Sequence, residues 1–295
     1  VRVGFRSELT VRTAGFAHTE PRTLAWSLAG RSMSRGIPAS LGGSSPQLLG
    51  DLNLEGSVRT VLAEARLEGS DALSEDDVRF AAIETASRLP VLVVEGWRDG
   101  NAALRGSAGF IRLALAPAPD TADAPGYVAI ELSDPAGLAT RSLDDLRAVV
   151  LASVSTPGST WTPRLADFVR QGGVLLVFTG PRVEAASYNA LFAPAGLMPG
   201  QLLDRVDFEP SAEIGFDFDP AQPHPALSAF RNYDRSGLAS ARVFSHWRFA
   251  SDADLAPLTV LALADNAGPA VLEHRLGAGR VIFACIGADA ESTTL

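Results

Sequence analysis

The sequence contains a single cysteine, Cys285, and only four histidines among 295 residues. One cysteine cannot form an internal disulfide, and no two histidines have the i, i+4 spacing of a zinc-binding helix. No apolar run approaches the ~18 residues of a membrane-spanning helix, and no signal peptide is visible. The basic residues do not cluster in this chain of net charge −9, so nucleic-acid binding is not expected. The sequence predicts neither a metal site nor another cofactor.

The chain has enough apolar material for a substantial core. Apolar residues make up 46% and charged residues 20% of the sequence, which is typical of a soluble globular protein. A length of 295 residues suits one large or two ordinary domains. Because the chain starts with Val1 and stops at Leu295 just after a strand-like run, we expect it to be part of a longer protein.

The stretch from Leu146 to Gly180 predicts a strand–helix–strand unit. Ala148–Ser153 is a short apolar run, typical of a parallel strand that helices cover on both faces. Thr162 as a cap and Pro163 at the first position begin a helix, which the pair Gly172-Gly173 ends.

Val174–Phe178 forms the second buried strand of this unit, and such crossovers are almost always right-handed. Ligands of open α/β sheets bind at the carboxyl ends of the strands. Thr179 and Gly180 follow the second strand directly, so we expect them near any ligand site.

Residues 1–89 predict an all-β domain, because several runs alternate apolar and polar residues between glycines. Pro38–Gly50 is predicted as a loop. The acidic turn that contains Asp71, Glu75, Asp76 and Asp77 favours a solvated turn that protects a sheet edge. Ca²⁺ binding is the alternative, although the EF-hand ligand spacing is missing. The predicted strands are Val1–Arg6, Glu8–Thr13, Arg22–Gly30, Val58–Leu67 and a last one from Val78 to Ile83.

Residues 90–295 predict an α/β domain that begins at the junction Arg88-Leu89-Pro90. Met198–Pro210 is predicted as a connecting lobe, and His224–Phe230 as a short helical turn. The sequence from Pro269 to Gly287 predicts a hairpin with its turn at Leu276–Gly279. Further strands are predicted at Pro90–Trp97, Tyr127–Leu132, Ser211–Pro220, Ala241–Phe249 and Thr259–Asp265, and helices at Ala102–Leu115 and Val183–Phe192.

Three segments carry a resemblance to known proteins. D-L-R-A-V-V-L from Asp145, F-V-R-Q-G-G-V-L-L-V-F-T-G from Phe168 and D-N-A-G-P-A-V-L-E-H-R-L-G-A-G-R-V-I-F from Asp265 occur in the order found in the class I glutamine amidotransferase-like fold. The chain resembles the ThuA-like group, and more closely the version in bacterial envelope proteins with Bat-type and von Willebrand A domains. Residues 69–85 resemble the last hairpin of the immunoglobulin-like module in those proteins.

This resemblance implies a fold, a location and a partner. The implied fold is an immunoglobulin-like β-sandwich over residues 1–89, followed by a mostly parallel three-layer α/β amidotransferase-like domain over residues 90–295. The implied location is the extracytoplasmic side of the cell envelope, with membrane helices outside this chain and a protein partner in the envelope.

The catalytic residues of the amidotransferase-like fold are not found in the sequence. Its nucleophilic cysteine position is occupied by Thr179, which has no evident base and precedes Pro181 closely. Phe283 departs from the Gly-x-Cys-x-Gly pattern, so Cys285 is interpreted as a buried strand residue. His224 is the best single polar candidate for the cleft, although the sequence favours its role as the cap of the turn that follows. His246 is interpreted as part of a cross-strand surface pair.

Three functional hypotheses remain open. The leading one is a non-enzymatic binding or scaffold segment of a membrane-anchored envelope protein, with Thr179, Gly180 and His224 as candidate ligand contacts. The alternative is a ThuA-like or amidotransferase-like hydrolase acting on a sugar or amide, which requires His224 and an acidic residue to converge beside Thr179. The third is Ca²⁺ or carbohydrate binding by the sandwich. The acidic stretch Asp207, Glu209, Glu213, Asp217 and Asp219 is interpreted as a solvated strand face, with a cation or a basic partner as its alternative.

Overall fold

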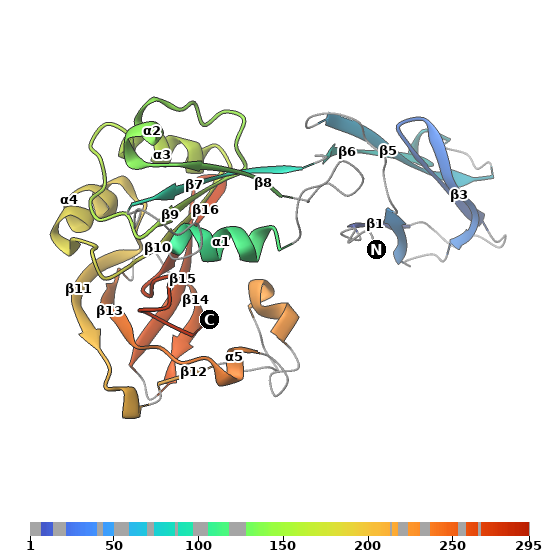
Figure 1. Cartoon of the computed structure of the whole chain (residues 1–295). Coiled ribbons are helices and arrows are strands. Elements are labelled where there is room, and N and C mark those ends of the chain that lie inside the picture. The colour runs from blue at the N-terminus through green and yellow to red at the C-terminus, as the bar shows by residue number, and fades with distance from the viewer. Residues whose placement is uncertain are drawn as a thin grey trace. The chain divides into compact units, whose positions relative to one another are not determined.

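The chain divides into two compact units, Val1–Arg88 and Leu89–Leu295, which are described separately (Figure 1). The predicted strand Val1–Arg6 and the acidic residues Asp71, Glu213 and Asp219 lie outside the described residues. The computed structural model describes residues 7–13, 22–39, 44–49, 59–69, 74–85, 88–96, 106–117, 128–212, 214–217, 224–230, 237–252, 258–264 and 267–294.

The first unit consists of two antiparallel sheets. One pairs β1 (Ser7–Arg12) with β4 (Ser44–Leu49), so the predicted loop Pro38–Gly50 is wrong over β4. Alternation places Leu24, Trp26 and Ala65 of the larger sheet on one face, where they pack with Leu9 of β1. The larger sheet has the order β3-β2-β5-β6, with β3 at Arg31–Ala39, β2 at Arg22–Leu28, β5 at Arg59–Glu68 and β6 at Val78–Thr85.

The acidic turn before β6 is only partly solvated. Glu75 and Asp76, in the short 3₁₀ helix η1 (Ser74–Asp76), are exposed as predicted. Asp77 is instead buried, and its Oδ1 lies 2.7 Å from Nη2 of Arg22 at the start of β2. The prediction of a solvated turn is therefore wrong at Asp77, because the pairing of β2 with β5 brings Arg22 to it.

The second unit is built around a mixed eight-stranded sheet. Five neighbouring strands (β8, β7, β9, β10 and β16) are parallel, and β15, β14 and β12 continue the sheet antiparallel. The strands in spatial order are β12 (Phe216–Asp217), β14 (Leu258–Leu263), β15 (Gly268–Leu276), β16 (Gly279–Ala284), β10 (Val174–Phe178), β9 (Ala148–Ala152), β7 (Leu89–Glu95) and β8 (Val128–Ser133). A separate pair joins β11 (Gly200–Asp207) to β13 (Ser245–Ser251), so the predicted lobe Met198–Pro210 is wrong over β11.

Helices cover both faces of this sheet (Figure 1). The larger core cluster lies between the sheet and α3, α4 and the β11–β13 pair, and the opposite face carries α1. None of the described helices combines the length and the apolar character needed to cross a membrane. The helices are α1 (Ser107–Leu115), α2 (Pro135–Thr140), α3 (Thr162–Arg170), α4 (Ala185–Ala195) and α5 (Gly237–Ser240), with 3₁₀ helices η2 (Pro210–Ala212) and η3 (Pro225–Phe230).

The predicted strand–helix–strand unit is confirmed as β9, α3 and β10, with the two strands parallel and adjacent. Gly172 has a φ of +111°, the left-handed conformation expected where a helix stops at glycine. The predicted cap is wrong: the helix begins at Thr162 itself, and the Thr162 hydroxyl donates to the carbonyl of Gly158 at 2.8 Å.

Candidate functional site

The order of the parallel strands identifies the place where this fold can form a crevice. The chain runs from β7 to β8 in one direction across the sheet, and from β9 to β10 to β16 in the other. In open α/β sheets, ligands bind at such a switch point, beyond the carboxyl ends of the strands. Here the switch lies between β7 and β9, which end at Glu95 and Ala152.

Ser153 follows β9 in a conformation that few residues adopt. Its φ is +51°, and a non-glycine residue in such a conformation costs on the order of 1 kcal/mol. Two glycines press on it: a Cβ at Gly96 would meet the Ser153 carbonyl oxygen at 2.3 Å, and one at Gly180 would meet Ser153 Oγ at 2.3 Å. The loops after β7 and β10 therefore hold Ser153 from both sides.

Four polar residues form what we call the strand-end network: Ser107, Ser153, Asp289 and Ser292. Ser107 Oγ lies 2.7 Å from Ser153 Oγ and donates to Asp289 Oδ2 at 3.2 Å. The hydroxyl of Ser107 has one proton and donates it to Asp289, so Ser153 is the donor in the bond between the two serines. The backbone N–H of Ser292 donates to Asp289 Oδ1 at 2.9 Å. The network thus joins the start of α1, the end of β9 and the segment after β16.

Sequence reasoning missed these four residues. The predicted site residues Thr179 and Gly180 lie beside the network, but both are buried. Thr179 is 0% exposed and its hydroxyl donates to the carbonyl of Ala284 at 3.0 Å. The indole N–H of Trp247, on β13, donates to the Gly180 carbonyl at 3.1 Å. Trp247 therefore covers the position at which an open cleft is predicted.

His224 lies outside the sheet, directly before η3. Its Nδ1 accepts a hydrogen bond from the backbone N–H of Ala226 at 3.2 Å, which confirms the capping interpretation. Its Nε2 lies 3.5 Å from Glu273 Oε2, and both side chains are about nine-tenths buried. Glu273 also pairs with Arg280 at 3.1 Å. His224 thus has an acidic partner, as the hydrolase hypothesis requires.

That partner is not beside Thr179. Glu273 on β15 pairs with Ile282 on β16, which in turn pairs with Leu176 on β10. Glu273 is therefore two strands away from β10, at the level of Leu176, three residues before Thr179. Strand spacing and rise put their backbones about 14 Å apart. Val177 points into the larger core cluster, and so does Leu272, the residue before Glu273. By alternation, Thr179 shares that face and Glu273 points to the other one, so the structure does not bring His224 and Thr179 together.

Cys285 is fully buried in the larger core cluster, and burial raises the pKa of its thiol well above the usual range. Its interpretation as a buried core residue is confirmed, but its predicted place in a strand is wrong, because β16 ends at Ala284 and Cys285 directly follows it. The reactive thiolate form is disfavoured in such surroundings.

Two other histidines are also buried. His246 is stacked on Phe208 with ring centroids 5.1 Å apart, so the predicted surface pair is wrong. Burial lowers the pKa of both His246 and His274. The Nε2 atoms bond to backbone carbonyls of Ala267 and Gly196, respectively. Over the described ranges, no group of His, Cys, Asp and Glu side chains is arranged to hold a metal ion.

A cavity of about 470 Å³ lies at the opposite, amino-terminal edge of β9 and β10. Its wall includes Asp144, Arg147, Arg164 and Asp167. Arg164 donates to the carbonyls of Leu138 and Ala139 at the end of α2, and Ser142 donates to Asp144. These charged groups already have protein partners.

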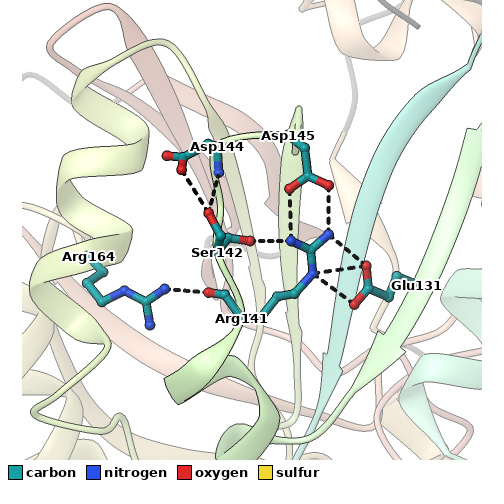
Figure 2. A network of polar contacts seen from close by, with 6 residues as sticks. All are labelled: Glu131, Arg141, Ser142, Asp144, Asp145 and Arg164. Carbon is teal, nitrogen blue, oxygen red and sulfur yellow. Dashed lines mark hydrogen bonds and ion pairs between the residues drawn. The ribbon is translucent and has the colours of Figure 1, made fainter. Parts of the chain in front are cut away.

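Arg141 forms ion pairs at the same edge of the sheet, as Figure 2 shows. It lies between Glu131 on β8 and Asp145, at 3.0 and 2.8 Å. The hydrogen bond from Arg141 lowers the pKa of Asp145, and its bonds to both carboxylates raise the pKa of Arg141. Because the carboxylates are largely exposed, this cluster contributes little to stability. We interpret the charged groups at this edge as structural and the strand-end network as the candidate site.

No protein-family model and no curated protein matches this chain. Among solved structures, it is similar to the cytoplasmic protein STM1381 from Salmonella typhimurium LT2, with 15% identity, 68% of this chain and 87% of that chain covered, and a TM-score of 0.46. For the cytoplasmic protein STM3548 from Salmonella typhimurium, the identity is 15%, the coverage 66% and 86%, and the TM-score 0.46. For the beta-galactosidase from Bacillus circulans sp. alkalophilus, the identity is 11% and the TM-score 0.44, and the match covers 70% of this chain and 29% of that chain. Likeness at this level carries no argument about activity.

These comparisons correct one prediction. The two Salmonella structures are titled as cytoplasmic proteins, which contradicts the predicted extracytoplasmic location in the cell envelope. The predicted envelope location is therefore wrong, and these distant structures assign no other location to this chain.

Proposed function

We propose that this chain is a non-enzymatic binding or scaffold segment for a protein partner. In this proposal, Leu89–Leu295 is an amidotransferase-like, ThuA-like domain that has lost its catalytic residues, and Val1–Arg88 is an immunoglobulin-like module. The parallel core strands support the fold assignment, because β9, α3 and β10 carry the segments on which the resemblance rests.

The observation that carries the proposal is the state of Thr179. A nucleophile must be reachable by substrate and must lie within hydrogen-bond distance of a base. Thr179 occupies the nucleophile position of the resembling fold, yet it is 0% exposed and its hydroxyl donates to a backbone carbonyl. The candidate base, His224, pairs with Glu273 on the other face of the sheet. This arrangement favours a structural role for Thr179.

A turnover assay tests the proposal. Wild type, Thr179→Val and Thr179→Ser would be incubated with glutamine and with aryl glycosides, and the release of ammonia and of the aryl group measured. We expect no release above the buffer rate from any of them. Release by the wild type and Thr179→Ser that is lost in a folded Thr179→Val variant would overturn the proposal and favour a hydrolase.

Binding requires its own measurement. The chain would be purified at native abundance from its source cells, and the stoichiometry of proteins eluting with it determined. A partner in fixed stoichiometry is expected. A strictly monomeric chain in all growth conditions would contradict the scaffold role.

A further inference from the structure

The segment Ile286–Thr294, which we call the strap, crosses the carboxyl ends of the parallel strands. One side of it is firmly attached through the backbone. The carbonyl of Ser292 accepts from the N–H of Phe244 at 2.8 Å, and the N–H of Thr294 donates to the carbonyl of Arg242 at 2.9 Å. Thr293 also forms a bridge with Val243. This side of the strap therefore pairs antiparallel with residues 242–244, directly before β13.

The strap packs closely on the predicted site. A Cβ at Gly287 would meet the carbonyl oxygen of Thr179 at 2.9 Å and Ser292 Oγ at 2.4 Å. Gly287 is itself buried, and Ser292 is 1% exposed. No larger residue fits between the strap and the end of β10, so the strap closes the strand ends above Thr179.

The other side of the strap is held differently. Towards α1, Ala288 packs against the small apolar cluster that contains Ala108. The polar link on this side is the hydrogen bond from Ser107 Oγ to Asp289 Oδ2, which continues to Ser153. Among the described residues, one side-chain bond at this edge contrasts with the row of backbone bonds at the other. Local opening begins where few bonds must break.

We infer that the strap is a cover over the switch-point crevice, hinged along residues 242–244 and latched to α1 by the bond between Ser107 and Asp289. Opening the latch uncovers Ser153 and the end of β10 at Thr179, while the backbone bonds near Arg242 stay intact. The inference rests on the proposed binding function, because a ligand or peptide that uses the strand ends must first displace this cover. It assigns Ser107 and Asp289 a positioning role and no chemical step.

Ser107→Ala is the sharpest variant, because residue 107 lies outside the strap and the substitution removes one hydroxyl, which bonds Asp289 in the strap and Ser153 after β9. Ser187→Ala is a matched control: the Ser187 hydroxyl donates to Glu184 Oε2 at 3.2 Å, the same length as the latch bond, on exposed α4 surface. Asp289→Asn is a second variant: its single carbonyl oxygen can accept from Ser107 or from the N–H of Ser292, but not from both.

Amide hydrogen exchange of the whole chain, read by mass spectrometry, measures the opening. We expect exchange in a peptide covering residues 286–294 to rise about tenfold in Ser107→Ala, because a hydrogen bond to a charged group is lost. Exchange in β9 and β10 should not change, and Ser187→Ala should match the wild type. Asp289→Asn should fall between the two.

Two results would overturn the latch. One is strap exchange in Ser107→Ala equal to that of the Ser187→Ala control. The other is a rise shared equally by β9 and β10, which would mean that the whole unit loses stability. Neither result depends on the turnover assay, so failure of the latch is distinguishable from failure of the proposed non-enzymatic function.

Discussion

Replacing Tyr188 with phenylalanine tests how the end of β9 is held in place. Tyr188 lies in α4, is 0% exposed, and its hydroxyl donates to the carbonyl of Val154 at 2.8 Å. Val154 directly follows Ser153, so this bond fastens the strained turn to α4. Phenylalanine keeps the ring, which meets Phe192 edge-on at 5.0 Å, and removes only the hydroxyl.

The magnitude follows from what the hydroxyl leaves behind. A typical intramolecular hydrogen bond contributes about 0.5–1.5 kcal/mol net, and a buried acceptor left without its partner costs about 1–3 kcal/mol. Val154 is itself 1% exposed, so water cannot easily replace the lost donor. We therefore expect Tyr188→Phe to lower the free energy of unfolding of the second unit by about 2 kcal/mol. For a unit of this size, that corresponds to a drop in melting temperature of about 4–8 °C.

Urea unfolding followed by exchange protection in α4 reads the second unit separately from the first. The midpoint should fall while the slope with urea stays constant. Ser187→Ala, in the same helix, removes an exposed hydroxyl and should change stability by less than about 0.5 kcal/mol. If Tyr188→Phe were as stable as Ser187→Ala, the bond from Tyr188 to Val154 would not stabilise the turn, and the reasoning would be refuted.

Two further predictions concern a buried ion pair and alkaline pH. Asp77→Ala removes the buried partner of Arg22 and should destabilise the first unit by about 2–3 kcal/mol, measured as faster exchange in β2 and β5; exchange equal to the wild type would contradict this role. Burial raises the pKa of Cys285 and of Tyr188, so both stay neutral in the fold while the unfolded chain ionises near pKa values of about 8.5 and 10. The unfolded chain then binds fewer protons than the native one, so stability that is complete below pH ~8.5 should fall as the pH rises. Cys285→Ala should flatten the fall of the urea midpoint between pH ~8.5 and ~10, and an unchanged slope would argue against a buried thiol.

The sequence predicted the parallel centre of the second unit well. Val174–Phe178 was placed without error as β10, because a purely apolar run between a Gly-Gly turn and Thr-Gly-Pro has few other interpretations. The hairpin of β15 and β16 is also confirmed, with Gly277 at a φ of +62° in its turn. In these segments, local chemistry and tertiary packing favour the same structure.

Other elements carry weaker local signals. Strand β11 has a buried residue at Leu202 but exposed residues on either side, and its hydrogen bonds go to β13, about forty residues further on. Such pairing depends on a distant segment that the sequence does not reveal. Helix α2 was missed although Asp134 and Pro135 give a start signal: Asp134 accepts from the N–H of Gly137 at 2.7 Å. Its six residues are too few for a periodic pattern.

The strand-end network was missed for a related reason. The resemblance predicts a site at Thr179, which follows β10, whereas the residue with the unusual backbone conformation is Ser153, which follows β9. The sequence holds one usable signal, because Ser153 ends a buried strand and precedes turn residues, as Thr179 does. The hydroxyl of Ser107 bonds to Ser153, 46 residues away, and to Asp289, 182 residues away, and no local pattern contains that information.

Three hydroxyl groups around these strand ends have protein partners within the chain. Thr179 donates to Ala284, Tyr188 to Val154, and Ser107 to Asp289, so each bond ties one loop to its neighbour. An enzyme of this architecture needs one such hydroxyl to stay accessible and to face a base. A hydroxyl that already donates to a protein carbonyl or carboxylate does not meet this need. The internal bonding instead favours a rigid end to the sheet with one weak point, the bond between Ser107 and Asp289. A partner that binds at the strand ends must therefore compete with the strap. A partner that binds another surface does not compete with the strap. Comparing partner affinity between the wild type and Ser107→Ala separates these two cases, because only the first predicts tighter binding when the latch is removed.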